Sequence, residues 1–141
     1  MKFNLEAGGG YQIVAYEEGR ITVAHAGGAP ATPAEALGGQ RETVESSVVV
    51  TPSRLIRAWP PERFEDLAAD HFAMLEELDP EVVLFGSGAR LRFPAAGCTA
   101  PLAARQIGVE VMDTAAACRT FNILAAEGRR VAAALLMIEA A

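Results

Sequence analysis

Short apolar runs that alternate with helix-like segments constrain the fold of this chain most strongly. The runs are VVLF (82–85), VEVM (109–112) and VAAALLMI (131–138). We interpret each as a buried strand, although the Ala and Leu residues of the last run also suit a helix. Strands and helices that alternate along a chain are typical of α/β proteins with parallel central strands.

Helix signals fill the segments around these strands. Apolar residues at helical spacing predict an amphipathic helix over 62–78, and a shorter helix is expected over 100–107. A further helix is predicted to begin at Asp113 or Thr114, because either side chain can accept bonds from free backbone N–H groups. It should end at Gly128, which suits a left-handed C-terminal cap.

The N-terminal half is expected to contribute antiparallel strands, the first two of which form a β-hairpin. The expected strands are residues 11–16, 20–25, 46–51 and 54–59. Trp59, at the end of the last one, is expected to cover the core. Residues 1–10 and 27–42 show little periodicity, so we expect them to be loose parts of a single domain spanning 1–141.

Composition and charge exclude several classes of protein. The chain has 141 residues, 51% of them hydrophobic, which fits one domain with a real core. Its net charge of -6 and pI of about 4.9 disfavour nucleic acid and anionic membranes as partners. The longest apolar run is far shorter than the roughly 20 residues of a membrane span. We therefore expect a soluble protein that is not an integral membrane protein, and a cytoplasmic one because its start lacks a secretory signal.

Cysteine and histidine spacing gives no sign of a metal site, a cofactor or a catalytic pair. Cys98 and Cys118 form no C-x-x-C motif, and His25 and His71 form no H-x-H or H-x-x-x-H motif. Cys118 falls on the apolar stripe of the helix after residue 113, so we expect it to be a small buried residue. The alternative is a nucleophile activated by the helix dipole. His71 is expected on the solvent face of its helix.

Polar residues follow the first two predicted parallel strands. Gly86-Ser87-Gly88 follows one strand and Asp113-Thr114 the other, so both turns should lie at the same sheet edge, where open α/β sheets bind ligands. A simple tight turn is the other interpretation, because neither the dinucleotide fingerprint nor the phosphate loop is present. Arg119 could bind an anionic group or tie down a neighbouring loop. The candidate ligand-binding residues are Gly86, Ser87, Gly88, Asp113, Thr114 and Arg119.

Two stretches of the sequence resemble a known family. LFGSGARLRFP and IGVEVMDTAAACRTFNILAAEGRRVAAALL are similar to a family of small domains of unknown function in bacteria and archaea. Its eukaryotic members include a mitochondrial assembly factor for respiratory complex I and an adipogenesis-associated protein. The resemblance covers roughly residues 45–138, with Ser87 in place of the usual Thr. It implies a three-layer α/β domain with a central mixed sheet and helices on its faces, to which the hairpin is added.

The resemblance also implies a function, for which two hypotheses stay open. The first is a non-enzymatic protein-interaction or assembly factor related to respiratory complex I biogenesis, with respiratory-complex or membrane-insertion components as partners. Its binding surface is expected near Trp59-Pro60-Pro61 or along 27–40. The second is a small-molecule-binding protein or enzyme that uses the crevice between 86–88 and 113–119.

Overall fold

The computed structural model describes residues 10–25 and 40–140, which form two sheets and several helices. The strands are β1 (Tyr11–Glu17), β2 (Arg20–His25), β3 (Gln40–Val44), β4 (Val48–Val50), β5 (Leu55–Ile56), β6 (Val82–Gly86), β7 (Gly108–Met112) and β8 (Val131–Leu135). The α-helices are α2 (Ala69–Ala73), α3 (Ala96–Ala103) and α4 (Thr114–Ala126). Two 3-10 helices, η2 (Phe64–Asp66) and η3 (Met74–Leu78), flank α2.

The larger sheet has five strands in the order β5-β4-β8-β6-β7. Its β6 pairs in parallel with both β7 and β8, which confirms the β-α-β interpretation. Its β4 pairs antiparallel with both β5 and β8. The α/β class and the mixed sheet are therefore confirmed, whereas the prediction of mostly parallel strands is not.

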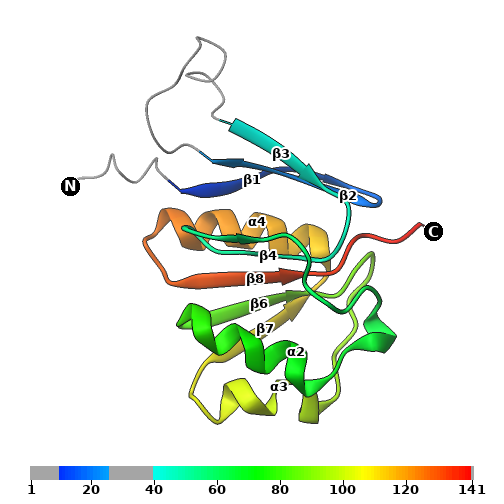
Figure 1. Cartoon of the computed structure of the whole chain (residues 1–141), viewed down its shortest axis with the longest axis vertical. Coiled ribbons are helices and arrows are strands. Elements are labelled where there is room, and N and C mark those ends of the chain that lie inside the picture. The colour runs from blue at the N-terminus through cyan, green and yellow to red at the C-terminus, as the bar shows by residue number, and fades with distance from the viewer. Residues whose placement is uncertain (1–9, 26–39, 141) are drawn as a thin grey trace.

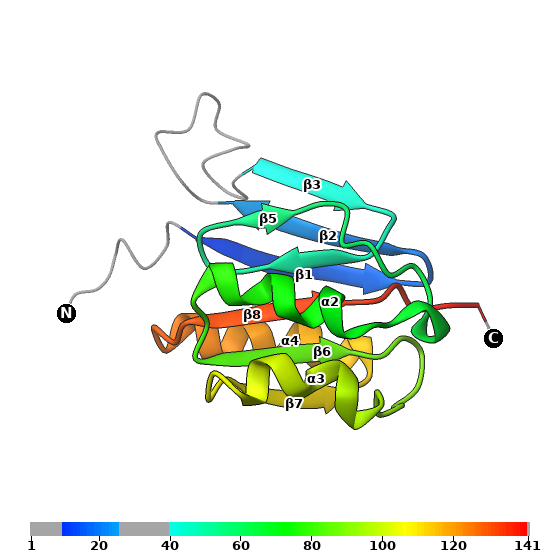
Figure 2. The ribbon, with the colours of Figure 1, turned by 60° about the horizontal axis from the view of Figure 1, so that its bottom comes forward.

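The smaller sheet is antiparallel, with the order β1-β2-β3. It contains the predicted hairpin and a third strand, β3, which includes residues 40–42 of the segment that we expected to be loose. The rest of the segments expected to be loose, residues 1–9 and 27–39, lies outside the described residues. Helix α4 lies between the two sheets (Figure 1), and α2 and α3 cover the other face of the larger sheet (Figure 2). The small sheet thus adds a layer to the three that were predicted.

Alternation along the central strands divides the core in two. In β8, Val131, Ala133 and Leu135 face α4, while Ala132 and Ala134 face the layer of α2 and α3. All five are at most 1% exposed. The Ala-rich run can form a strand because both of its faces are buried, as in other sheets that are covered on both faces.

The helix predicted over 62–78 is broken into η2, α2 and η3. The break falls at Ala68, whose backbone is extended (φ -143°, ψ 163°). The N–H of Ala68 donates to Nδ1 of His71 over 3.0 Å, and the carbonyl of His71 accepts a bond from Nε1 of Trp59 over 3.1 Å. His71 is therefore half-buried and makes structural hydrogen bonds, so it is only partly exposed on the face that we expected to meet solvent.

Other boundaries also differ from the prediction. Helix α3 spans Ala96–Ala103, so it begins four residues before the expected 100–107 helix and has Pro101 inside it. Strand β7 is the edge strand of its sheet and only half-buried, whereas we expected a buried strand. Trp59 is 2% exposed and packs between Phe72 and Phe85, which confirms its predicted place over the core.

Candidate functional site

The carboxyl end of β6 meets the N-terminus of α4 in a network of buried hydrogen bonds. The Thr114 N–H donates to the Gly88 carbonyl (2.9 Å), and the Gly88 N–H donates to the Thr114 hydroxyl (2.9 Å). That hydroxyl in turn donates to the carbonyl of Leu136 (2.7 Å). Thr114 thereby ties the turn after β6 to the segment that follows β8. We call these bonds the junction.

Ser87 is the second buried hydroxyl of the junction. Its Oγ donates to the Arg90 carbonyl (2.7 Å) and accepts the N–H of Arg92 (3.0 Å), while its own N–H donates to the carbonyl of Met112 (2.9 Å). Ser87 and Thr114 are both 0% exposed. Their polar atoms are thus satisfied by the protein itself, as buried polar groups must be.

Two glycines permit this close approach. A Cβ on Gly86 would come within 3.0 Å of the Thr114 Cα and 2.9 Å of its Oγ1. Gly88 has φ +103°, and a Cβ there would clash with the Glu139 carboxylate. The glycines therefore serve the packing of the turn against α4 and against the C-terminal segment.

The remaining two predicted site residues have identified partners. Asp113 caps α4, and its Oδ1 accepts the N–H of Ala116 (2.8 Å), which confirms the predicted start of the helix. Arg119 is exposed and donates to Tyr16 Oη on β1 (2.8 Å). The structure thus joins residues 86–88 to Asp113-Thr114, while the hydrogen bond of Arg119 is to the small sheet. Ligand binding by the six residues stays a prediction.

Asn122 makes a structural contact that the sequence did not reveal. Its side-chain amide accepts the N–H of Ile13 (2.9 Å) and donates to the carbonyl of the same residue (2.8 Å). The Asn122 amide thus pairs with the β1 backbone as a neighbouring strand would, beside the β-bulge between Ile13 and Ala15. Together with the Arg119–Tyr16 bond, it fastens the small sheet to α4.

Cys118 lies in the core on the buried face of α4. The thiol is 1% exposed and packs with Ala117 and Phe121, as predicted from the apolar stripe. Burial raises the pKa of Cys118 to about 12, although the nearby Arg119 charge acts in the opposite direction. Such a thiol is protonated at neutral pH, so the nucleophile interpretation of Cys118 loses its chemical basis.

Alkylation should therefore distinguish the two cysteines. With a pKa of about 12, Cys118 holds about a thousandfold less thiolate at pH 8 than an ordinary thiol, and burial blocks access as well. We expect iodoacetamide to modify the native protein at the half-buried Cys98 and to reach Cys118 only after unfolding in urea. Peptide mass spectrometry gives the result. Equal rates at both cysteines in the native protein would contradict the buried position of Cys118.

The loop of residues 89–94, which we call the docking loop, carries two large apolar side chains that are exposed near the junction. Leu91 is 51% exposed and Phe93 is 70% exposed. Between them, Arg92 turns inward, with its guanidinium 4.6 Å from the centroid of the Phe64 ring and a bond to the Ser87 carbonyl (3.2 Å). The junction therefore holds this loop in place from beneath.

Two hollows flank Arg92. One, of about 490 Å³, is lined by the β1–β2 turn, by η2 and by the segment 136–140. The other, of about 560 Å³, lies beside the docking loop and is lined by Leu67, Pro94 and Cys98, among others. Arg92 and Phe64 form part of both walls. The docking loop thus lies beside concave surface that Arg92 and Phe64 help to form.

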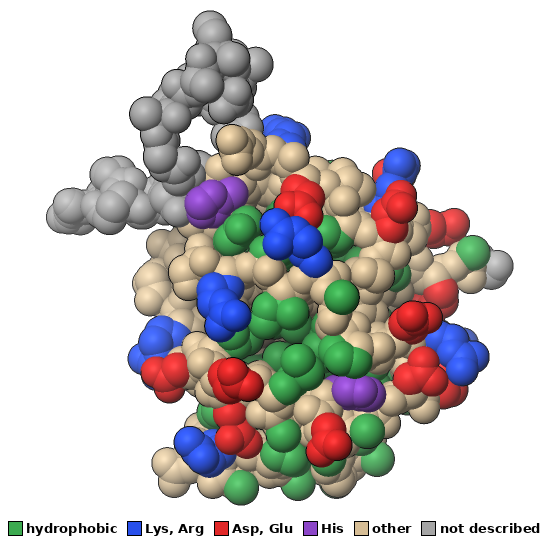
Figure 3. Space-filling model, viewed as in Figure 1, with side chains coloured by type: hydrophobic (Ala, Val, Ile, Leu, Met, Phe, Trp, Pro, Cys, Tyr) green, Lys and Arg blue, Asp and Glu red, His purple; other side chains and the backbone are tan. Residues whose placement is uncertain are grey.

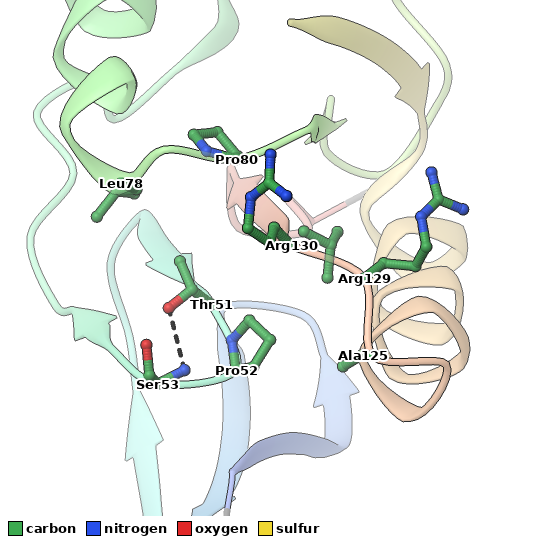
Figure 4. Close-up of a pocket in the computed structure, with 10 residues that line it drawn as sticks. Thr51, Pro52, Ser53, Leu78, Pro80, Ala125, Arg129 and Arg130 are labelled. Carbon is green, nitrogen blue, oxygen red and sulfur yellow. Dashed lines mark hydrogen bonds between the residues drawn. The ribbon is translucent and has the colours of Figure 1, made fainter. Parts of the chain in front are cut away.

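A further pocket, of about 310 Å³, lies at the opposite end of the central strands (Figure 4). Pro52, Leu78, Pro80 and Val131 give it apolar walls, and Arg129 and Arg130 lie at its rim. Arg129 Nε donates to Glu81 (3.1 Å), and Arg130 Nε donates to the Asp79 carbonyl (3.1 Å). Both guanidinium groups are therefore directed to the protein's own acceptors, so the pocket makes a weak site for an anion.

The charges and possible metal ligands show no concentrated site. On the face shown in Figure 3, acidic and basic side chains are interspersed around a central hydrophobic area. Within residues 10–25 and 40–140, no group of three or more His, Cys, Asp or Glu residues could hold a metal ion. None of the helices in this described part is long and apolar enough to cross a membrane.

Comparisons with known proteins agree with the fold and the motifs. Assembly factor 3 of the NADH dehydrogenase [ubiquinone] 1 alpha subcomplex from Danio rerio is 36% identical over 96 residues, which is 67% of this chain and 55% of that protein. The Homo sapiens assembly factor 3 is 38% identical over 80 residues, or 55% of this chain and 44% of that protein. The chain thus spans about half the length of the curated relatives it matches.

Solved structures cover the chain more fully. A crystal structure of a Bordetella parapertussis protein matches with a TM-score of 0.73 and 35% identity, over 91% of this chain and 96% of that one. An NMR structure of a Xanthomonas campestris protein matches with a TM-score of 0.71 and 32% identity, over 90% and 84% of the two chains. The family model "Protein of unknown function (DUF498/DUF598)" matches residues 13–136. This chain therefore belongs to the DUF498/DUF598 family.

Proposed function

We propose that the chain is an assembly factor for respiratory complex I that acts by binding a protein partner and not by catalysis. The names of its relatives from vertebrates and from Drosophila melanogaster support the assembly role. The buried Cys118 and the internally paired Ser87 and Thr114 support a non-enzymatic role, since a nucleophile needs an accessible, activated group.

The observation that carries the proposal is the exposed pair Leu91 and Phe93 on the docking loop. Large apolar side chains that are held rigidly at a surface bind partners well, because little conformational freedom is lost on association. The surface expected at Trp59-Pro60-Pro61 has a weaker basis, because Trp59 is 2% exposed and its ring faces the core. The other expected surface, along 27–40, lies outside the described residues apart from Gln40.

The test compares two exposed apolar sites in the native cell. Tagged wild type, the double variant Leu91→Ser/Phe93→Ser and the control Ile123→Ser are expressed at native level in a strain that lacks the chromosomal copy. Ile123 is 58% exposed on α4, so its replacement removes an exposed apolar side chain outside the docking loop. Affinity purification with quantitative mass spectrometry measures complex I subunits, and membrane NADH–quinone reductase activity measures assembly.

We expect wild type and the Ile123 variant to recover complex I subunits and to restore reductase activity. The double variant should recover at least about tenfold less, as expected when a hot spot is removed. Equal recovery with the double variant would contradict docking through this loop. The assembly role itself would be contradicted by two results together. These are normal reductase activity in the deletion strain and the recovery of no complex I subunit with the tagged wild-type protein.

A further inference from the structure

The C-terminal segment delivers a carboxylate to the base of the docking loop. Glu139 Oε1 accepts the N–H of Ala89 (2.5 Å), and its Oε2 accepts an N–H of Arg92 (2.7 Å). These residues lie about 50 positions apart in sequence and meet because the segment after β8 passes the turn after β6. The first donor of the docking loop and its inward-facing arginine thus bind the same acid.

Backbone bonds hold the segment that carries Glu139. The Leu136 N–H donates to the Gly86 carbonyl (3.0 Å), and the Gly19 N–H donates to the Ile138 carbonyl (2.9 Å). Ile138 also forms a parallel bridge with Glu18 at the β1–β2 turn. These bonds fix residues 136–138, whereas the Glu139 side chain beyond them is 52% exposed. The side chain can therefore turn away while the backbone of the segment remains in place.

The donors form a site that is shaped for a carboxylate. Gly88, at φ +103°, turns the Ala89 N–H toward the acid, and the absence of a Cβ there leaves room for it. Arg92 is 21% exposed and rests on the Phe64 ring. Burial disfavours the charged form of Glu139, but its hydrogen bonds and the Arg92 charge outweigh this effect and hold its pKa below the ordinary value. The site thus stabilises a carboxylate at neutral pH.

We infer that the Ala89 N–H and the Arg92 guanidinium are a receptor for an Asp or Glu side chain of the protein partner, and that Glu139 fills this receptor in the free chain. The partner segment carries apolar residues near its acid, because Leu91 and Phe93, the sequence neighbours of Arg92, are exposed. This inference rests on the proposed docking function and names the chemistry of the partner. When the partner docks, its carboxylate replaces that of Glu139 at these two donors.

The test removes the Glu139 carboxylate from the receptor in the 141-residue chain. Glu139→Ala removes the resident carboxylate, and Glu65→Ala is the matched control, because Glu65 also approaches Arg92 (3.6 Å) but makes no bond to Ala89. The probe is a fluorescent peptide LMIEA, the sequence of residues 136–140, with an amidated C-terminus so that its Glu side chain is its only carboxylate. LMIQA, amidated in the same way, is its counterpart without a carboxylate. Fluorescence anisotropy measures binding to each purified protein.

We expect Glu139→Ala to bind LMIEA about tenfold more tightly than wild type or Glu65→Ala, since a charge-assisted bidentate contact becomes available. LMIQA should bind no variant at this level. Adding Arg92→Lys or Arg92→Gln to Glu139→Ala should abolish the gain, and thermal melts identify any variant that fails to fold. The Lys variant retains the charge but lacks the guanidinium that bonds the Ser87 carbonyl and Glu139 together and lies over the Phe64 ring.

Equal binding of LMIEA by wild type and Glu139→Ala, or equal binding of LMIEA and LMIQA, would overturn the receptor. An absence of binding by every variant would overturn it too. These measurements use the purified chain alone, so they fail independently of the purification from cells. A positive peptide result with no complex I subunit recovered would overturn the assembly role and leave the receptor standing.

Discussion

Replacing Trp59 with alanine is expected to lower the free energy of unfolding by about 3–5 kcal/mol. The indole is 2% exposed, and its ring centroid lies 5.8 Å from that of Phe72 and 6.2 Å from that of Phe85. The substitution leaves a cavity between the larger sheet and α2. It also removes the donor to the His71 carbonyl, which helps to fix the break before α2. Urea unfolding followed by far-UV circular dichroism gives the change.

Phe93→Ala is the matched control for this measurement. It removes an aromatic ring that is 70% exposed, so the free energy of unfolding should change by only about 0.5 kcal/mol. We thus expect Trp59 to contribute to the stability of the fold and Phe93 to contribute to partner docking. A loss below about 1 kcal/mol for Trp59→Ala would show that Trp59 does not support the core in this way.

The central β-α-β part of the fold could be predicted because its signals are local. The apolar runs of β6 and β8 are flanked by turns, and the α4 segment carries both of its caps in sequence, Asp113 and Gly128. In the structure, Gly128 has φ +81°, and the Arg129 N–H donates to the Leu124 carbonyl, which closes the predicted C-terminal cap. Patterns of this kind act over a few residues, so a single sequence reveals them.

Elements that depend on distant partners escaped prediction. Strand β3 has the sequence QRETV, in which only Val44 is buried, so its pattern does not predict a strand. Its extended conformation depends on pairing with β2. The 62–78 segment has helical spacing, yet Trp59 and His71 hold its backbone open at Ala68. In both cases tertiary contacts outweigh local preference.

The sequence predicted that the turn after β6 lies beside the start of α4, but it did not predict the hydrogen-bond partners there. The order of strands put the turn after β6 beside Asp113-Thr114, as the parallel register of β6 and β7 confirms. The partners of those polar atoms could not be known, because Leu136 and Glu139 arrive from the end of the chain. The Ala89 N–H after the turn binds the Glu139 carboxylate of the same chain, and ligand binding by the six candidate residues stays a prediction.

Replacing Thr114 with valine is expected to lower the free energy of unfolding by about 2–4 kcal/mol. Valine keeps the shape of threonine but leaves the Gly88 N–H and the Leu136 carbonyl without the hydroxyl that now bonds both, at a position that is 0% exposed. Unpaired buried groups of this kind are costly because they have lost water without gaining a partner. Urea unfolding measures the loss, and hydrogen exchange at the Gly88 amide should become faster.

Two further substitutions isolate the hydroxyl as the cause. Thr114→Ser retains the donor and acceptor and should cost clearly less than Thr114→Val, whereas Thr120→Val, at a half-buried position of the same helix, should cost below about 1 kcal/mol. If valine at 114 and at 120 cost the same, the bonds of the junction would contribute little to stability. The docking loop begins at the junction, so the same substitution should also loosen the Ala89 N–H that holds Glu139. If hydrogen exchange at the Ala89 amide stays at its wild-type rate in Thr114→Val, the junction does not hold the receptor in place.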